Sequence, residues 1–155
     1  MKLEDLIQSN LTADGTLDLE AQDLGDATVA ELAGMDILQK VTRLELGYNS
    51  VSNVGAAALS ASPHLQNLKV LNLKSNKISA AGAASIAGAK IFSNLEQLIL
   101  KFNEIGEEGA RHIAASETLS NLTTLDLFRN HMGSEGARLI KAAKNFTKLS
   151  RVRLD

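Results

Sequence analysis

The stretch Leu95-Glu96-Gln97-Leu98-Ile99-Leu100-Lys101-Phe102-Asn103-Glu104-Ile105 decides the fold of this protein. Leu98 and Leu100 are two positions apart, so in a short strand both face one side while the residue between them faces the other. The polar Asn103 and the apolar Ile105 then follow at the strand's end. The stretch therefore predicts a strand with one buried face that leads into a tight turn.

The same pattern recurs along the chain with a constant step of 27 residues. The asparagine column contains Asn49, Asn76, Asn103 and Asn130. The two leucine columns contain Leu17, Leu44, Leu71, Leu98, Leu125 and Val152, and then Leu19, Leu46, Leu73, Leu100, Leu127 and Leu154. Self-similarity at a fixed period is the signature of a protein in which repeated units stack on their neighbours. The columns predict about six parallel strands.

The second half of each unit has the spacing of a helix. Its glycine and alanine pairs are Gly55-Ala56, Gly82-Ala83, Gly109-Ala110 and Gly136-Ala137, followed three residues later by Leu59, Ile86, Ile113 and Ile140. Apolar residues three apart share one helix face. We interpret the small residues as close packing and not as a phosphate site, because Glu107, Glu108 and Glu135 stand beside them and would repel phosphate.

The asparagine column is best explained by structure and not by chemistry. An amide side chain both donates and accepts hydrogen bonds, so it can satisfy backbone groups in the turn that leaves each strand. We expect Asn49, Asn76, Asn103 and Asn130 to form a ladder from repeat to repeat. The same interpretation applies to a second column before the strands, which contains Asn67, Asn94 and Asn121.

With these columns in place, the sequence resembles the leucine-rich-repeat family, whose pattern Leu-x-x-Leu-x-Leu-x-x-Asn-x-Ile is matched by residues 95–105. The glycine-alanine half resembles the ribonuclease-inhibitor-like subclass. The resemblance runs from Leu17 to the end of the sequence. It implies an α/β fold: a curved solenoid, or horseshoe arc, with a parallel concave sheet of about six strands and helices on the convex side. The arc arises because helices are wider than the ~4.8 Å between strands.

We expect a single domain over residues 1–155. It divides into an N-terminal cap with a degenerate first repeat (1–40), four regular repeats (41–148) and a terminal half-repeat strand (149–155). The first unit departs from the pattern with Gln22 in place of asparagine and Thr28 in place of glycine. Before it, Leu3, Leu6 and Ile7 are spaced to form one face of a short helix that covers the end of the core.

Composition narrows the classes of partner. The 155 residues carry a formal net charge of −2, which disfavours nucleic acid and membrane surfaces as partners. The chain has no cysteine, so it has neither a thiol nucleophile nor a thiolate metal site. Acidic residues interrupt the N-terminal Met1-Lys2-Leu3-Glu4-Asp5, unlike a signal peptide. We expect a cytoplasmic protein. The alternative is export by a route that needs no N-terminal signal.

No candidate for catalysis emerges. His64, His112 and His131 occupy three different columns in three different repeats, so they are not expected to converge on a metal or a nucleophile. No Ser/His/Asp arrangement is evident, and the glycines recur with the repeat and not as a nucleotide loop. We therefore expect no catalytic residue, no metal site and no cofactor.

The outward strand positions predict a binding surface on the concave face. Tyr48, Phe102 and Phe128 fall in outward columns, where core packing does not explain them, whereas Phe92 and Phe146 fall in a core column. Aromatic and arginine side chains together are typical of protein interfaces. The candidate contact residues are Tyr48, Val70, Ile99, Lys101, Phe102, Phe128 and Arg129. The alternative is that Phe102 and Phe128 fold over neighbouring strands and cover gaps.

The sequence thus predicts a non-enzymatic module that binds a protein partner on its concave face. The family resemblance allows a second function, because some similar repeats activate small GTPases; here Arg129 or an exposed asparagine would contribute to that activity. A third interpretation is a self-associating scaffold or a fragment of a larger repeat protein. We expect a monomer. The alternative is a dimer through the edge strand in residues 149–155, although Arg151 and Arg153 in this strand can protect its edge.

Overall fold

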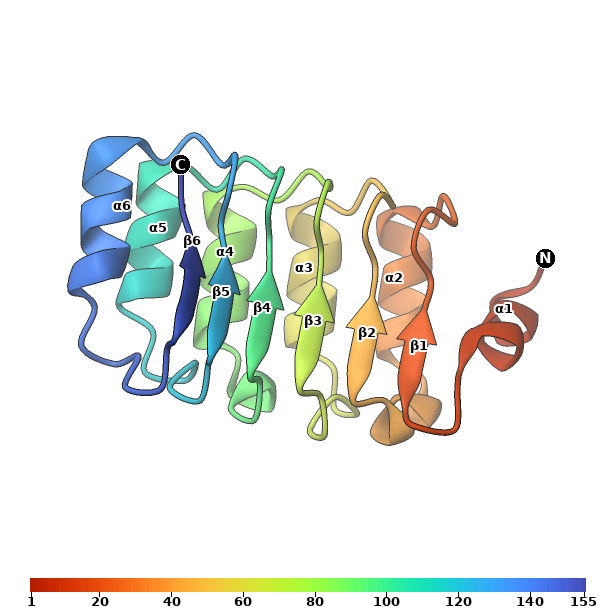
Figure 1. Cartoon of the computed structure of the whole chain (residues 1–155). Coiled ribbons are helices and arrows are strands. Elements are labelled where there is room, and N and C mark those ends of the chain that lie inside the picture. Colours follow the sequence, from red (N-terminus) through yellow and green to blue (C-terminus); the bar gives the residue numbers. More distant parts are fainter.

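A computed structural model describes all 155 residues as a row of strand-and-helix repeats (Figure 1). The strands are β1 (Thr16–Asp18), β2 (Arg43–Glu45), β3 (Val70–Asn72), β4 (Gln97–Ile99), β5 (Thr124–Asp126) and β6 (Arg151–Arg153). They form one parallel sheet in the order β1-β2-β3-β4-β5-β6. Each strand residue pairs with its counterpart one repeat later, as Leu44 does with Leu71. The predicted six strands and their register are confirmed.

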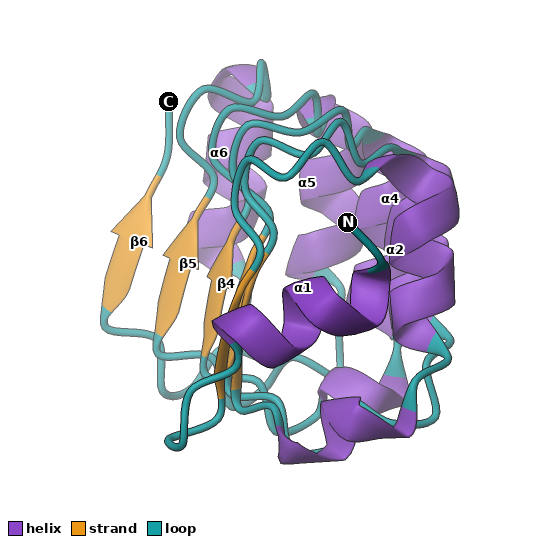
Figure 2. Ribbon diagram, turned by 90° about the vertical axis from the view of Figure 1, so that its right-hand side faces the viewer, coloured by secondary structure: helices purple, strands orange, loops and turns teal.

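The return legs are helical, as the glycine-alanine spacing predicts. The helices are α1 (Leu3–Asn10), α2 (Gly25–Ala33), α3 (Asn53–Ser60), α4 (Ala80–Gly88), α5 (Gly106–Ala114) and α6 (Gly133–Ala142), with short 3-10 helices η1 (Asp36–Lys40) and η2 (Lys90–Phe92). Helices α2 to α6 lie side by side on one side of the sheet (Figures 1 and 2). The molecule is therefore a two-layer, curved α/β solenoid whose other sheet face is free.

The core lies between the two layers. The leucines of the two strand columns in β1 to β5 have no exposed surface, and Phe92 is the largest side chain that is fully buried. In β6 the equivalent Val152 is 41% exposed, and Leu154 is half-buried. The core is thus closed along the row and open beside β6.

Small residues allow the helices to approach each other. A Cβ atom added to Gly109 would lie 2.5 Å from Cγ2 of Ile105 and 3.3 Å from the Cα of Ala80. Alanines that follow the glycines, such as Ala83 and Ala110, are fully buried between helices. The glycine-alanine pairs therefore serve close packing, as the sequence predicts.

Helix α1 covers the first end of the core. It lies across the gap between the sheet and the helices (Figure 2). Leu3 and Ile7 are buried in the core, and Leu6 packs against it while partly exposed. The predicted capping helix is confirmed.

The asparagine column forms the expected ladder. Nδ2 of Asn76 donates to the carbonyls of Leu46 and Leu73, each at 3.0 Å. Its Oδ1 accepts from the N–H groups of Asn49 at 3.1 Å and Val51 at 2.9 Å. Each asparagine thus joins the turn of its own repeat to the turn of the preceding repeat, so the column is structural.

Two further ladders join the repeats elsewhere. Asn67, Asn94 and Asn121 donate to the carbonyls of Gln39, Gln66 and Ser93, respectively, at 2.9, 2.9 and 2.7 Å. At the starts of the helices, Asp26 accepts from the N–H groups of Ser52 and Gly55, and Asn53 accepts from those of Ser79 and Gly82. This third ladder was not among the sequence-based predictions. The sequence does contain a sign of this ladder: Asp26 and Asn53 are 27 residues apart, and so are Ser52 and Ser79.

Candidate functional site

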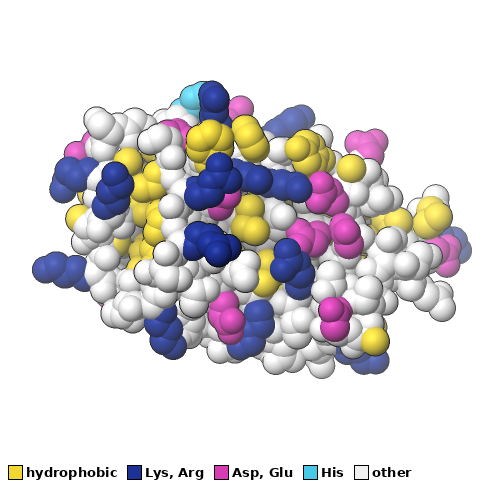
Figure 3. Space-filling model, viewed as in Figure 1, with side chains coloured by type: hydrophobic (Ala, Val, Ile, Leu, Met, Phe, Trp, Pro, Cys, Tyr) yellow, Lys and Arg dark blue, Asp and Glu magenta, His cyan; other side chains and the backbone are white.

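The free face of the sheet is the candidate binding surface, and its charges are segregated. Basic side chains gather over the later strands beside a group of hydrophobic side chains, whereas acidic side chains lie over the first two strands (Figure 3). The acids are Asp18, Glu20 and Glu45, and the bases are Lys74, Lys101, Arg129, Arg151 and Arg153. Glu45 is buried beside Arg43 of the same strand, so Asp18 and Glu20 supply the accessible acidic groups at the first end of the face.

The turn that leaves each strand has an unusual backbone conformation. The residue before each ladder asparagine, and its counterpart in the first repeat, has a positive φ: 56° at Ala21, 56° at Tyr48, 54° at Ser75, 59° at Phe102 and 60° at Arg129. This left-handed conformation is unfavourable for residues other than glycine. It recurs in five turns, so it belongs to the repeat geometry. It places the side chains of Tyr48 and Phe102 at the rim of the sheet, where they are 54% and 46% exposed.

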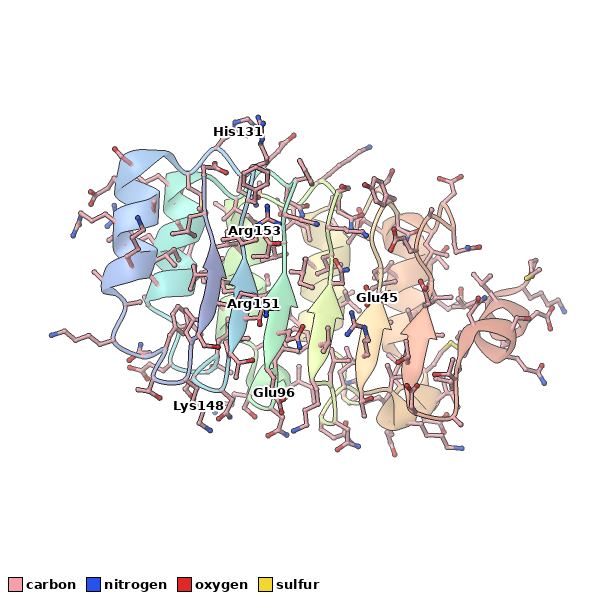
Figure 4. The ribbon with its side chains drawn as sticks, viewed as in Figure 1. Glu45, Glu96, His131, Lys148, Arg151 and Arg153 are labelled. Atoms are coloured by element: carbon pink, nitrogen blue, oxygen red, sulfur yellow. The ribbon has the colours of Figure 1, made fainter.

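Two aromatic rings and two guanidinium groups meet over β5. The rings of Phe102 and Phe128 contact edge to face, with centroids 5.9 Å apart and an interplanar angle of 79°. The Cζ atoms of Arg129 and Arg153 lie 5.3 and 4.9 Å from the centroid of the Phe128 ring, within the range of cation–π attraction. We call these four residues the Phe128 cluster. Arg153 extends from β6 across the face of the sheet (Figure 4).

A shallow groove adjoins the Phe128 cluster. Its volume is about 490 Å³, and its lining residues are Asn76, Phe102, Asn103, Glu104, Phe128, Arg129 and His131. Two of the ladder asparagines form part of its wall, and they are already engaged with the backbone. The groove therefore offers aromatic and basic side chains, with Glu104 as its one carboxylate.

Tyr48 stands apart from the Phe128 cluster. It follows β2, two strands away from β4, and the residue at the equivalent position between them is Ser75. Nζ of Lys74 lies 5.6 Å from the centroid of the Tyr48 ring and 3.1 Å from Oε1 of Glu20. Tyr48 is thus part of a separate contact at the acidic end of the face.

The remaining candidate residues differ in exposure. Ile99 and Lys101 are half-buried on the free face, where a partner can reach them. Val70 is only 8% exposed, because its neighbours in the sheet are the longer side chains of Arg43 and Gln97. We correct the candidate surface by leaving Val70 out of it.

Two acids of the face, Asp126 at the end of β5 and Glu45 at the end of β2, are engaged by groups of the protein itself. Oδ1 of Asp126 accepts from the N–H of Phe128 at 3.1 Å, and Oδ2 lies 3.5 Å from Nη1 of Arg153. Glu45 is 8% exposed, its Oε1 lies 2.5 Å from Nε of Arg43, and its Oε2 is buried without a hydrogen bond. These carboxylates therefore contribute little to the exposed surface.

Arg153 was not among the contact residues predicted from the sequence. The sequence does indicate that Arg153 pairs with Asp126. The two residues are 27 apart, so they are neighbours on adjacent strands, where opposite charges attract. That Arg153 also stacks on Phe128 depends on side-chain positions from two different strands.

The structure offers no arrangement for metal chemistry. No group of three or more His, Asp or Glu side chains is placed to hold a metal ion. His131 lines the groove and His64 contacts Gln39 from a different edge of the molecule, so the structure does not bring the histidines together. No helix has both the length and the apolar character needed to cross a bilayer.

Comparisons with known proteins agree with this architecture. A search of curated proteins by sequence finds no significant match. Among solved structures, the Leiomodin-1 Actin-Binding Site 2 is similar, with a TM-score of 0.66 and 15% sequence identity over 93% of this chain and 85% of that chain. An internalin from Listeria monocytogenes aligns with a TM-score of 0.45 and 22% identity, over 79% of this chain and 36% of that one.

The family described as Leucine Rich repeat matches residues 38–60, 64–87, 93–114 and 118–141. These four stretches span most of the chain, so it belongs to the leucine-rich-repeat family.

Proposed function

We propose that this protein is a non-enzymatic interaction module that binds a protein partner on the free, concave face of its sheet. The contact residues are Tyr48, Ile99, Lys101, Phe102, Phe128 and Arg129. The observation that carries the proposal is the exposure of Phe102, whose side chain is 46% exposed at the rim. Core positions of the repeat also hold phenylalanine, and there Phe92 and Phe146 are buried. Exposed aromatic and arginine side chains are the groups that most often dominate protein interfaces.

The comparisons support the class of partner. Leucine-rich repeats are a protein-interaction fold, and a structure of similar shape is named an actin-binding site. At 15% identity this likeness extends to the fold alone, so we propose a protein partner from the repeat family and do not propose actin. The α-helical return leg of every complete repeat is also what the ribonuclease-inhibitor-like subclass would require, and on this ground we propose that the chain belongs to that subclass.

The experiment is capture of partners by the immobilised protein, identification by mass spectrometry, and measurement of the purified pair. Replacement of both Phe102 and Phe128 by serine should weaken the complex by about tenfold or more. The free energy of unfolding should fall by only about 1 kcal/mol, since the edge-to-face pair is lost. The matched control is Val54→Ser, which changes a residue 66% exposed on α3. An unchanged affinity of the double variant would contradict the proposal.

A second candidate function, self-association through β6, is favoured by one observation. Beside β6 the open core forms a depression of about 500 Å³, lined mainly by apolar side chains such as Phe146, Val152 and Leu154. Light scattering over a range of concentrations tests it. A concentration-dependent dimer that Val152→Lys abolishes would support it, and a monomer throughout would exclude it.

A further inference from the structure

Three cations on the basic half of the concave face have no ionic partner within the chain. Lys101, Arg129 and Arg151 take part in none of the ion pairs, which involve other basic residues. Arg153 has one long contact, 3.5 Å to Asp126. The protein as a whole has a net charge of −2, so this concentration of unpaired positive charge is local to β4, β5 and β6.

The acids of the same region do not neutralise these cations. Asp126 is largely buried and accepts a hydrogen bond from the backbone of Phe128. The carboxylate of Asp155 accepts hydrogen bonds from the backbone N–H groups of Arg129, Asn130 and His131. Glu104 remains as an exposed acid at the groove. Asp155 and Glu104 are thus exposed acids beyond the ends of the strands, whereas basic side chains predominate over the strands themselves (Figure 3).

The Phe128 ring holds two of the guanidinium groups in place. Arg129 and Arg153 both stack on it, from the turn after β5 and from β6, respectively. A guanidinium group above a ring keeps N–H groups that can bind a carboxylate. Arg129 has no ion pair within the protein, and Arg153 has only its 3.5 Å contact with Asp126. Neither side chain donates a hydrogen bond within the protein. Guanidinium groups with free edges bind carboxylates through two parallel hydrogen bonds, which are stronger than neutral ones.

We propose that the basic half of this face recognises an acidic segment of the partner, in which aspartate or glutamate carboxylates flank an apolar side chain. The carboxylates bind Arg129, Arg153 and Lys101, and the apolar side chain packs on the exposed edge of Phe102. Asp18 and Glu20 at the other end of the face repel the same segment, so it lies over β4 to β6. This inference rests on the proposed function and adds the chemistry of the partner.

The test uses two synthetic probe peptides, Glu-Leu-Glu-Glu-Leu-Glu and its lysine counterpart Lys-Leu-Lys-Lys-Leu-Lys. Backbone amide resonances of the isotope-labelled protein are followed by NMR during titration. The acidic peptide should shift the amides of Lys101, Phe102, Phe128 and Arg153, and the shifts should vanish at about 0.5 M salt. The lysine peptide should leave them in place. No shift with the acidic peptide, or equal shifts with both, overturns the proposal.

The variant Arg129→Gln with Arg153→Gln should weaken binding of the acidic peptide by about tenfold. The matched control, Lys141→Gln with Lys144→Gln, removes two unpaired cations from the α6 side of the molecule, and its affinity should equal that of the wild type. Equal weakening in both variants would mean that only net charge matters, which overturns a specific site.

The two proposals fail separately. If a captured protein loses affinity with the Phe102 and Phe128 variant but not with the arginine variant or in salt, the concave face binds protein and the acidic chemistry is wrong. If the phenylalanine variant binds the captured protein like the wild type, the proposed function itself is wrong, whatever the peptides do.

Discussion

The side-chain amide of Asn76 donates a hydrogen bond to the carbonyl of Leu46, 30 residues earlier, at 3.0 Å. Both groups are buried where no strand pairing is available to them, so the side chain replaces the missing backbone partner. The same relationship recurs from Asn49 to Leu19, from Asn103 to Leu73 and from Asn130 to Leu100. Each of these four turns is therefore joined to the preceding turn by one buried side-chain amide.

Asn76→Ala should lower the free energy of unfolding by about 3 kcal/mol or more, because several buried backbone groups lose their partner at once. The matched control is Asn94→Ala in the second ladder, where one exposed hydrogen bond to Gln66 is lost and the change should be about 1 kcal/mol or less. Urea unfolding at equilibrium measures both. Equal losses would show that burial of the ladder has no energetic weight.

Leu100→Ala should lower the free energy of unfolding by about 2–5 kcal/mol, because the side chain is fully buried and its removal leaves a cavity between sheet and helices. Val54→Ala, on the exposed side of α3, should change it by less than about 0.5 kcal/mol. Thermal and urea unfolding of the two variants provide the comparison, and a loss below about 1 kcal/mol at Leu100 would be at odds with a tightly packed core.

Gly109→Ala should destabilise the protein by about 1–3 kcal/mol, although alanine is the better helix former, because the added methyl group would approach Ile105 and Ala80 too closely. Gly88→Ala in α4 is the control. Nothing lies within 4 Å of its added methyl group, so this change should be neutral or stabilising. Unfolding midpoints that move in the same direction would argue against helix contact as the reason for the glycine column.

Stability should fall in acid partly through Asp26. Burial raises the pKa of Asp26, but hydrogen bonds from the Ser52 hydroxyl and from the N–H groups of Ser52 and Gly55 outweigh it, so its pKa lies below the ordinary 3.8. The unfolded chain therefore takes up the proton first. The stability contributed by Asp26 is complete above the ordinary pKa, and it is lost as pH falls through the lower pKa of the folded state.

Asp26→Asn tests this assignment, because an amide oxygen still accepts hydrogen bonds, as Asn53 does one repeat later, but cannot be protonated in this range. The free energy of unfolding of the variant should decline less steeply than that of the wild type between about pH 5 and pH 2. Urea midpoints at each pH provide the measurement. Curves that run parallel would assign the acid sensitivity to other carboxylates.

The sequence predicted the fold in detail because its signals are local and repeated. Alternation within each strand and the spacing of Ala83 and Ile86 each depend on a few neighbouring residues, and the constant step fixes which strands pair. The sequence also placed Phe102 and Phe128 on the outward side correctly. It gave no warning of the positive φ at Phe102, because residues other than glycine rarely adopt that conformation.

What the sequence by itself determined is the repeat, the six strands, the buried columns and the outward position of Val70, Ile99 and Lys101, which alternate with the buried leucines. Only the tertiary structure decided which outward residues a partner can reach. Val70 is covered although it is outward, Phe102 is turned to the rim by its positive φ, and Phe128 lies close to guanidinium groups from two different segments. The physical reason is that alternation fixes the direction of a side chain only within a strand, whereas direction in the turns, exposure and contacts depend on backbone conformation and on neighbours in adjacent repeats.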